Sequence, residues 1–191
     1  MAKFRRKNKA VFIDRDGTII RERNYLRRIK DVGLMAGAVK GLQRLRAAGY
    51  KLVMVTNQSG IGRGYLTEKK LKQIRAYLQK ILAKKKAGFD AVYYCRHLPD
   101  DGCNCRKPKL GMVKKAAKRL NINLKKSFSI GDHTNDFLLG QNMGGRGIFL
   151  LTGHGREELR KIRNGPRRLS PDKIAGSFIE SVKWIIKQDE N

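Results

Sequence analysis

Two carboxylates placed two positions apart form the first reactive group of the sequence. Asp14 and Asp16 belong to the pentapeptide Asp-Arg-Asp-Gly-Thr, which follows an apolar stretch at residues 9–13. One carboxylate of such a pair can attack phosphorus while the other manages the proton of the leaving group. An ordinary surface turn is the alternative, because Asp and Gly are common turn residues. The pair taken alone leaves both interpretations open.

Three further polar clusters also follow apolar stretches. Residues 56–60, Thr-Asn-Gln-Ser-Gly, offer hydroxyl, amide and backbone N–H groups that can cradle a phosphate, or else form an ordinary loop with cap residues. Lys107, in Arg-Lys-Pro, can offset the charge of a phosphoryl group. Asp132 and Asp136 suit a hard cation such as Mg²⁺, although they also fit a helix N-cap and a first-turn acid.

A short loop at residues 95–105 contains all three cysteines of the chain. Cys95, His97, Cys103 and Cys105 provide a Cys₃His set, which is a common tetrahedral zinc site. The odd cysteine count and the lack of a recognisable secretion signal disfavour disulfides. We therefore expect a structural Zn²⁺ that fixes the loop leading to Lys107.

These clusters need a scaffold that brings distant parts of the chain together. Short apolar runs predict buried parallel strands at residues 9–13, 51–55, 91–94, 127–130 and 147–151. Helical spacing predicts helices at residues 37–48, 112–120 and 179–186. It predicts a further helix that begins after an N-cap at Thr67 and ends at Gly88. The alternation predicts an α/β, Rossmann-like three-layer sandwich with a mainly parallel central sheet. Ligands bind such sheets at the carboxyl ends of the strands, so the clusters should share one edge.

Composition bounds the class of protein. The 191 residues, 40% of them hydrophobic, suit a single domain over residues 1–191. No apolar stretch is long enough for a membrane span, and the one after the basic residues 1–10 is too short for a signal peptide. A cytoplasmic location and no membrane partner are therefore expected.

The charge is unusual, because 44 Lys and Arg residues against 16 Asp and Glu give a net charge of +28. A basic field can gather anionic metabolites or nucleic acid, or the surface can be basic without consequence for function. The cations are spread along the predicted helices, and the aromatic residues, 7% of the chain, do not interleave with them as base stacking would require. We expect a monomer that binds polyanions nonspecifically. A polynucleotide-end phosphatase and a nucleic-acid-binding protein remain alternatives.

Together, the four strand-end clusters resemble the haloacid dehalogenase superfamily of phosphohydrolases over residues 9 to about 152. The resemblance implies that Asp14 is the nucleophile and Asp16 the general acid and base. Thr56 and Lys107 would hold the transferred phosphoryl group. The short connections leave room for a flap and a minimal cap, so the site should be fairly open.

The resemblance also implies a Mg²⁺ site. Asp14, the backbone carbonyl of Asp16 and Asp132 would hold the ion. Asp136 would support Lys107 or the metal shell. The two cofactors expected are therefore a catalytic Mg²⁺ and a structural Zn²⁺.

The cysteine loop narrows the resemblance to one group. Tyr-Tyr-Cys-Arg-His at residues 93–97 and Cys-Asn-Cys-Arg-Lys-Pro at 103–108 are similar to the D-glycero-D-manno-heptose-1,7-bisphosphate phosphatases of lipopolysaccharide biosynthesis and to histidinol-phosphate phosphatases. The implied substrate is a small sugar phosphate, with histidinol phosphate as the alternative. His133 stands where the group often carries lysine. The expected substrate-binding residues are Glu22, Tyr25, Thr56, Asn57, Gln58, Ser59, Arg106, Lys107 and His133.

Overall fold

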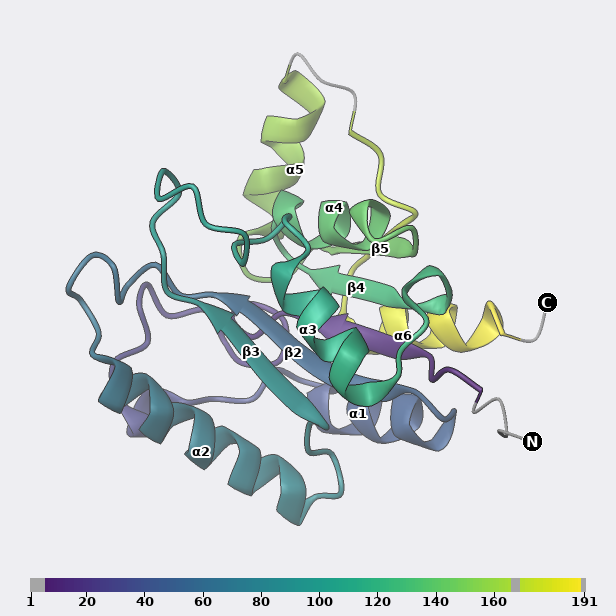
Figure 1. Ribbon diagram of the computed structural model, residues 1–191, viewed down its shortest axis with the longest axis horizontal. Coiled ribbons are helices and arrows are strands. Elements are labelled where there is room, and N and C mark those ends of the chain that lie inside the picture. Colours follow the sequence, from purple (N-terminus) through teal and green to yellow (C-terminus); the bar gives the residue numbers. More distant parts are fainter. Residues whose placement is uncertain (1–5, 166–168, 190–191) are drawn as a thin grey trace.

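Six parallel strands form one sheet at the centre of the molecule (Figure 1). The computed structural model describes residues 6–165 and 169–189. The strands are β1 (Ala10–Ile13), β2 (Lys51–Asn57), β3 (Ala91–Cys95), β4 (Phe128–Gly131), β5 (Arg146–Leu150) and β6 (Lys173–Ala175). Their order in the sheet is β3-β2-β1-β4-β5-β6. From β1 the chain builds the sheet in one direction through β2 and β3, and then in the other direction through β4, β5 and β6, so the order reverses between β1 and β4.

Helices connect the strands and cover both faces of the sheet (Figure 1). They are α1 (Ala38–Ala47), α2 (Glu68–Lys84), α3 (Gly111–Leu120), α4 (Thr134–Asn142), α5 (Gly155–Asn164) and α6 (Phe178–Lys187), with short 3₁₀ helices at Ile29–Asp31 and Leu124–Lys126. No helix in the described ranges combines the length and apolar character needed to cross a membrane.

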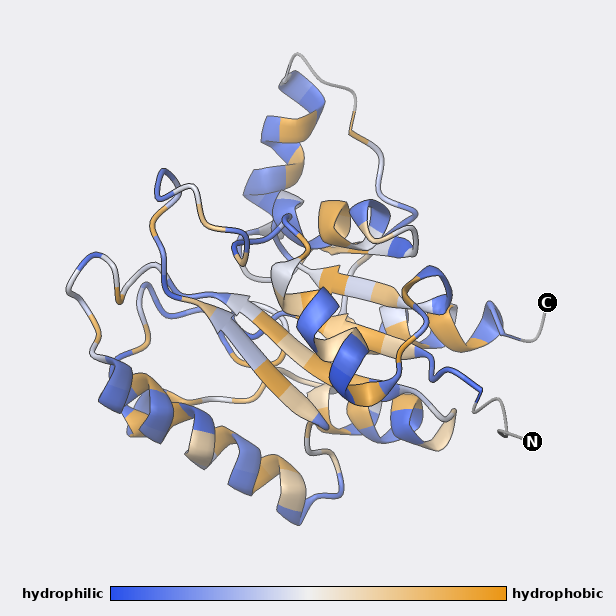
Figure 2. Cartoon of the chain, viewed as in Figure 1, coloured by the Kyte–Doolittle hydropathy of each residue, from blue (hydrophilic) through white to orange (hydrophobic). Residues whose placement is uncertain are grey.

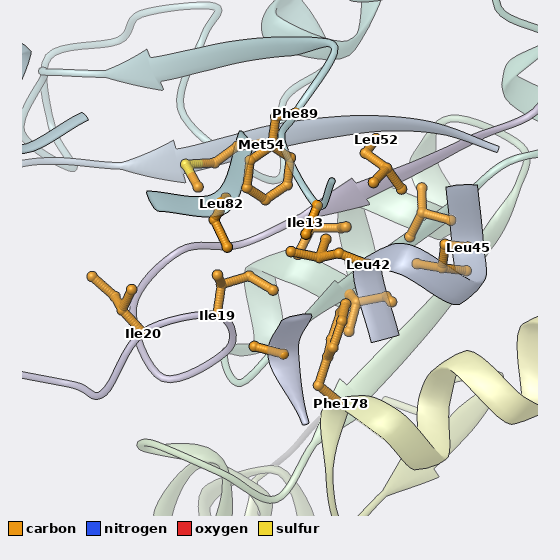
Figure 3. Packing of buried hydrophobic residues seen from close by; sticks show 14 of the residues in the cluster. Ile13, Ile19, Ile20, Leu42, Leu45, Leu52, Met54, Leu82, Phe89 and Phe178 are labelled. Atoms are coloured by element: carbon orange, nitrogen blue, oxygen red, sulfur yellow. The ribbon is translucent and has the colours of Figure 1, made fainter. Parts of the chain in front are cut away.

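The alternation of side chains along β1 divides the core into two layers. Val11 and Ile13 pack into a cluster with α1, α2 and α6, whereas Phe12 packs into a second cluster with α3 and α4. Figure 3 shows Ile13 near Leu42 of α1 in the first cluster. Apolar residues concentrate on the strands and on the sides of the helices that face them (Figure 2). The predicted three-layer α/β sandwich is confirmed.

The main differences between the predicted elements and the structure lie at the ends of β2 and α2 and in three elements that were not predicted. Strand β2 continues through Asn57, so Thr56 and Asn57 lie on the strand and not in the following loop. Helix α2 ends at Lys84 and not at Gly88, because Lys86 takes a left-handed conformation with φ of 54°. Strand β6 and helix α5 were not predicted, because β6 has three residues and α5 buries only Gly155. Helix α4 was not predicted as an element either, since a helix there was considered only as an alternative explanation of Asp132 and Asp136.

Helix α4 packs very closely against β5. A Cβ added at Gly147 would lie 2.0 Å from the carbonyl oxygen of Phe137, and one added at Gly140 would lie 2.4 Å from that of Arg146. Real Cβ atoms do not approach backbone oxygens so closely, so glycine at both positions allows the helix to sit on the strand. This packing fixes the start of α4, which carries Asp136.

We predict that Gly147→Ala lowers the free energy of unfolding by about 1–3 kcal/mol, because the methyl group would push α4 away from β5. Urea denaturation measures the change. Gly102→Ala is the comparison, because nothing lies within 4 Å of a Cβ there and only its positive φ of 64° is unfavourable. An unchanged stability of Gly147→Ala would contradict the close packing.

Candidate active site

The carboxyl ends of β1, β2 and β4 meet the segment after the cysteine loop around a cavity of about 340 Å³. Its lining includes Asp14, Asp16, Glu22, Tyr25, Thr56, Asn57, Gln58, Ser59, Arg106, Lys107, His133 and Asp136. These are all the predicted catalytic and substrate-binding residues, together with Asp136. Asp132 is buried, and one of its carboxylate oxygens lies within 4.8 Å of those of Asp14 and Asp136. The structure thus brings the four sequence clusters to one edge of the sheet.

Lys107 holds the centre of this edge. Its ammonium group donates to Asp14 Oδ1 at 2.5 Å, to Asp136 Oδ1 at 2.5 Å and to the carbonyl oxygen of Val55 at 2.9 Å. The side chain is only 3% exposed. Burial lowers the pKa of Lys107, but the carboxylates of Asp136 and Asp14 outweigh that effect and hold the pKa above its usual value. The lysine therefore carries its charge inside the protein.

Asn57 positions the backbone of Lys107. Its side-chain oxygen accepts from the Lys107 N–H at 3.0 Å, and its amide nitrogen donates to the Lys107 carbonyl at 3.3 Å. The predicted strand-end residue thus lines the cavity, but both ends of its amide bind the chain itself. In this way β2 fixes the segment that follows the cysteine loop.

Three carboxylates crowd together beside Lys107. Asp14, Asp132 and Asp136 offer oxygens that all lie within 4.8 Å of one another. Burial raises the pKa of Asp14 to about 6, with Asp136 and Asp16 adding to the effect and Lys107 opposing it. Burial, Asp14 and Asp136 raise the pKa of Asp132 to about 8. One ammonium group does not neutralise this concentration of negative charge.

Asp132 has one oxygen whose hydrogen-bonding capacity is unused. Its Oδ2 accepts from the backbone N–H of His154 at 2.8 Å, whereas its buried Oδ1 has no hydrogen-bond partner in the described part of the chain. Gly17 lies so close that a Cβ there would be 2.2 Å from Oδ2. An unpartnered carboxylate oxygen among other hard oxygen ligands fits a Mg²⁺ ion. The predicted ligands Asp14 and Asp132 therefore have the chemistry that this cofactor needs.

The sequence left open whether Asp132 caps a helix. The N-cap residue of α4 is His133, and Asp136 is the acid of its first turn, accepting from the His133 N–H at 3.0 Å. Asp132 is therefore not the cap. Asp136 combines this structural role with its contact to Lys107.

Asp16 is held by a network that the sequence did not reveal. Arg15 donates to both of its oxygens at 2.9 and 3.0 Å, and Gln58 donates to its Oδ2 at 3.0 Å. Arg15 also donates to Gln58 at 2.9 Å, and Gln58 donates to the hydroxyl of Thr56 at 3.0 Å. Arg15 is 1% exposed and is among the most deeply buried side chains described, which argues against the alternative of an ordinary surface turn. Its bidentate contact fixes the orientation of Asp16.

Other side chains form the mouth of the cavity. Tyr25 has a positive φ of 59°, and its ring meets that of Tyr65 edge-on with centroids 4.9 Å apart. Burial and the neighbouring Asp16 raise the pKa of Glu22. His133 and His154 face each other across the mouth, with ring centroids 5.4 Å apart. His154 was not predicted, since it follows β5 at a position without a recognisable polar cluster.

The four side chains of the cysteine loop converge at one point. The Sγ atoms of Cys95, Cys103 and Cys105 lie 3.2–3.6 Å apart, and His97 Nδ1 lies 3.5 and 3.2 Å from Cys95 and Cys105. Tetrahedral Zn²⁺ with Zn–S distances of about 2.3 Å requires sulfur separations of about 3.7 Å. The spacing is too long for disulfides and close to that of a metal site.

The fold and the carboxylate–lysine cluster define a class of protein, the haloacid dehalogenase-like phosphatases. A family model described as polynucleotide kinase 3 phosphatase matches residues 9–148, and the chain belongs to this phosphatase family. The superfamily resemblance predicted from the strand-end clusters is confirmed.

Individual relatives carry names that state a substrate. A D-glycero-β-D-manno-heptose-1,7-bisphosphate 7-phosphatase of Helicobacter pylori (strain J99 / ATCC 700824) is 45% identical over 147 residues, which cover 76% of this chain and 84% of that protein. A D-glycero-α-D-manno-heptose-1,7-bisphosphate 7-phosphatase of Photorhabdus laumondii is 36% identical, over 80% of this chain and 87% of that protein. The crystal structure of a D,D-heptose 1,7-bisphosphate phosphatase from B. bronchiseptica, complexed with magnesium and phosphate, has a TM-score of 0.83 and 27% identity, covering 94% of this chain and 99% of that one.

The raised pKa values predict how the stability of the metal-free protein depends on pH. Between the ordinary aspartate pKa and the raised values, the folded protein binds more protons at Asp14 and Asp132 than the unfolded chain does. The stability that these groups contribute is present at acidic pH and is lost as the pH rises through about 6 and about 8. In EDTA, the free energy of unfolding of Asp132→Asn should therefore fall less than that of wild type as the pH rises from about 5 to about 8.5.

Urea denaturation across this range measures the difference. Asp100→Asn is the control, because Asp100 is exposed and lies outside the cavity, and it should follow the wild-type profile. Parallel profiles for wild type and Asp132→Asn would show that the buried carboxylates do not govern this dependence.

Proposed function

We propose that this protein is a Mg²⁺-dependent phosphatase that removes the 7-phosphate of D-glycero-D-manno-heptose 1,7-bisphosphate. The observation that carries the proposal is the contact between Lys107 and Asp14 at the carboxyl edge of the sheet, with Asp132 and Asp136 beside it. Relatives at up to 45% identity with this activity, and a similar structure that holds magnesium and phosphate, support it. We place this role in the cytoplasmic biosynthesis of surface glycans, with the protein acting as a monomer.

Asp14, Asp132 and the backbone carbonyl of Asp16 would hold the Mg²⁺. When bound, the ion supplies positive charge that stabilises phosphoryl oxygens and leaves the Asp14 carboxylate ionised. Lys107 supplies further positive charge beside Asp14, and its other partner, Asp136, keeps the ammonium group oriented. Thr56 lies beside them with a hydroxyl that can donate to a phosphoryl oxygen.

In the first step, an oxygen of Asp14 attacks phosphorus and the bond from phosphorus to the sugar oxygen breaks. Asp16 gives its proton to the departing sugar oxygen, so the products are the free alcohol and an aspartyl-phosphate on Asp14. In the second step, water attacks phosphorus and loses a proton to Asp16, and the bond to Asp14 breaks. Inorganic phosphate leaves, and both side chains return to their starting states. Arg15 and Gln58 hold Asp16 throughout.

Residues at the mouth of the cavity would bind the sugar and its second phosphate. Arg106 lines the cavity and donates to the carbonyl oxygen of His97 at 3.2 Å, which orients its guanidinium group. His133, Ser59 and the segment from Glu22 to Tyr25 complete the mouth. The small cavity favours a compact substrate over a polynucleotide end.

We also propose that Cys95, His97, Cys103 and Cys105 bind a structural Zn²⁺. Four protein ligands leave no coordination position for substrate, so the ion would stabilise the loop and not react. The loop joins β3 to Arg106 and Lys107, and the Arg106–His97 contact connects the two parts directly. Loss of zinc would thus affect the catalytic lysine through the position of its backbone.

Hydrolysis of a panel of phosphorylated metabolites, histidinol phosphate and 3′-phosphate oligonucleotides with Mg²⁺ tests the substrate. The highest kcat/KM is expected for the heptose bisphosphate, with release of the 7-phosphate. A preference for histidinol phosphate would favour that alternative, and one for the oligonucleotide would favour a polynucleotide-end phosphatase.

We predict that Asp14→Asn lowers kcat by at least about a thousandfold, because an amide cannot form the aspartyl-phosphate. Phosphate release under saturating substrate measures kcat, and circular dichroism checks the fold. Asp31→Asn is the matched control, since Asp31 lies outside this cavity and pairs with Arg28. Wild-type turnover by Asp14→Asn would contradict the nucleophile.

We predict that the purified protein contains about one zinc per chain and that Cys103→Ser loses it. Since Cys103 belongs to the loop before Lys107, kcat should fall together with thermal stability. Metal analysis by mass spectrometry gives the stoichiometry. A stable, active wild-type protein without zinc would contradict this assignment.

A further inference from the structure

A second cavity, of about 600 Å³, lies at the other end of the sheet. Six cations line it: Arg6, Lys7, Lys9, Lys125, Lys126 and Arg146. They come from the segment before β1, from the 3₁₀ helix before β4 and from the first residue of β5. The cavity therefore surrounds the amino ends of neighbouring central strands, whereas the catalytic cavity surrounds carboxyl ends. Figure 1 shows these amino ends on the side of the molecule where the described chain begins and ends.

The charge of this second cavity is largely uncompensated. Among the residues that the structure describes, its lining contains one carboxylate, Asp189, which accepts from Lys9 and from the hydroxyl of Tyr50 at 2.5 Å each. Arg146 donates to Gln188, a neutral side chain. Within the described ranges, Arg6, Lys7, Lys125 and Lys126 have no ion pair. Converging cations without carboxylate partners form a site for an anionic ligand.

The floor of the cavity indicates how such a ligand would bind. Phe128 is only 6% exposed and packs edge-on against Tyr50 and Trp184, with ring centroids 6.0 Å away in each case. The guanidinium group of Arg146 lies 5.8 Å from the Trp184 ring. These rings are buried or covered, so they offer no open face on which a base could stack. Recognition would therefore use charge and hydrogen bonds and not stacking on a base.

The described residues around this cavity also lack an exposed apolar anchor. The large apolar side chains that are most exposed in the described chain are Tyr65, Tyr77 and Ile174, and none of them lines this cavity. A protein partner or a membrane surface would use such side chains in addition to charge. A phosphodiester backbone needs only Lys and Arg placed along its path.

We propose that this second cavity docks the phosphodiester backbone of a nucleic acid, without preference for sequence. The site is separate from the catalytic edge, so docking does not require that the polynucleotide be a substrate. The proposal is independent of the proposed phosphatase reaction, because it uses none of the residues of that cavity.

A charge-matched pair of variants tests the site. Lys125→Gln/Lys126→Gln removes two cations from the cavity, whereas Lys114→Gln/Lys115→Gln removes two adjacent exposed lysines from α3. Fluorescence anisotropy with a labelled 20-base-pair duplex DNA gives the dissociation constant at several salt concentrations. Loss of two phosphate contacts should reduce the slope of log K against log salt by about 1.8 and weaken binding about tenfold at low salt.

The α3 variant should keep most of the wild-type slope, and both variants should retain wild-type turnover of the phosphatase substrate. Equal losses of DNA affinity in the two variants would overturn the proposal, because binding would then follow total charge. Wild-type affinity in the cavity variant would also overturn it. Binding to vesicles that contain anionic lipid is measured as well. If the cavity variant lost binding to vesicles but not to the duplex, the cavity would be assigned to a membrane surface instead.

Discussion

The buried ammonium group of Lys107 is the constraint on which the catalytic edge depends. It is satisfied by Asp14 after β1, by the Val55 carbonyl of β2 and by Asp136 in the first turn of α4. A buried charge that loses one partner is destabilised by about 3–5 kcal/mol, so these elements must keep their relative positions. The same contacts that stabilise the lysine place it against Asp14. The distances that stabilise the buried ammonium group are therefore the same ones that place it beside the proposed nucleophile.

The edge is nevertheless unbalanced in charge. Asp14, Asp132 and Asp136 supply three carboxylates against one buried lysine, and the pKa values of Asp14 and Asp132 are raised to about 6 and about 8 as a result of burial and of this crowding. A phosphate group entering alone would meet further negative charge. A cation beside Asp132 resolves the repulsion among the carboxylates and also supplies a partner for the phosphoryl oxygens. The same crowded carboxylates that repel one another without a metal would thus bind a cation, and that cation would bind the phosphate.

The sequence predicted the parts of this site that depend on strand-end position. Asp14, Thr56 and Asp132 stand at the ends of apolar runs, and the topology of a parallel sheet brings such residues together, whereas Lys107 reaches the same edge at the end of the cysteine loop. It could not predict the burial of Arg15, since whether its guanidinium turns inward depends on Gln58, which is 43 positions away. His154 was missed for a similar reason, because its contact with Asp132 is made by a backbone N–H, which every residue except proline possesses. Strand β6 has too few residues for a periodic pattern and forms only by pairing with β5.

The net charge of +28 has different consequences at long and at short range. Out to about one Debye length from the surface, about 8–10 Å, the field draws any anion toward the protein and does not distinguish the two ends of the sheet. Discrimination begins only at contact. At the carboxyl edge, the carboxylate cluster would admit an anion together with the proposed cation, and Arg15 is already engaged by Asp16 and Gln58. At the amino edge, the proposed phosphodiester ligand would meet Lys125 and Lys126 directly. The surface charge can therefore concentrate phosphorylated ligands at both ends, while the chemistry of each edge determines which ligand stays.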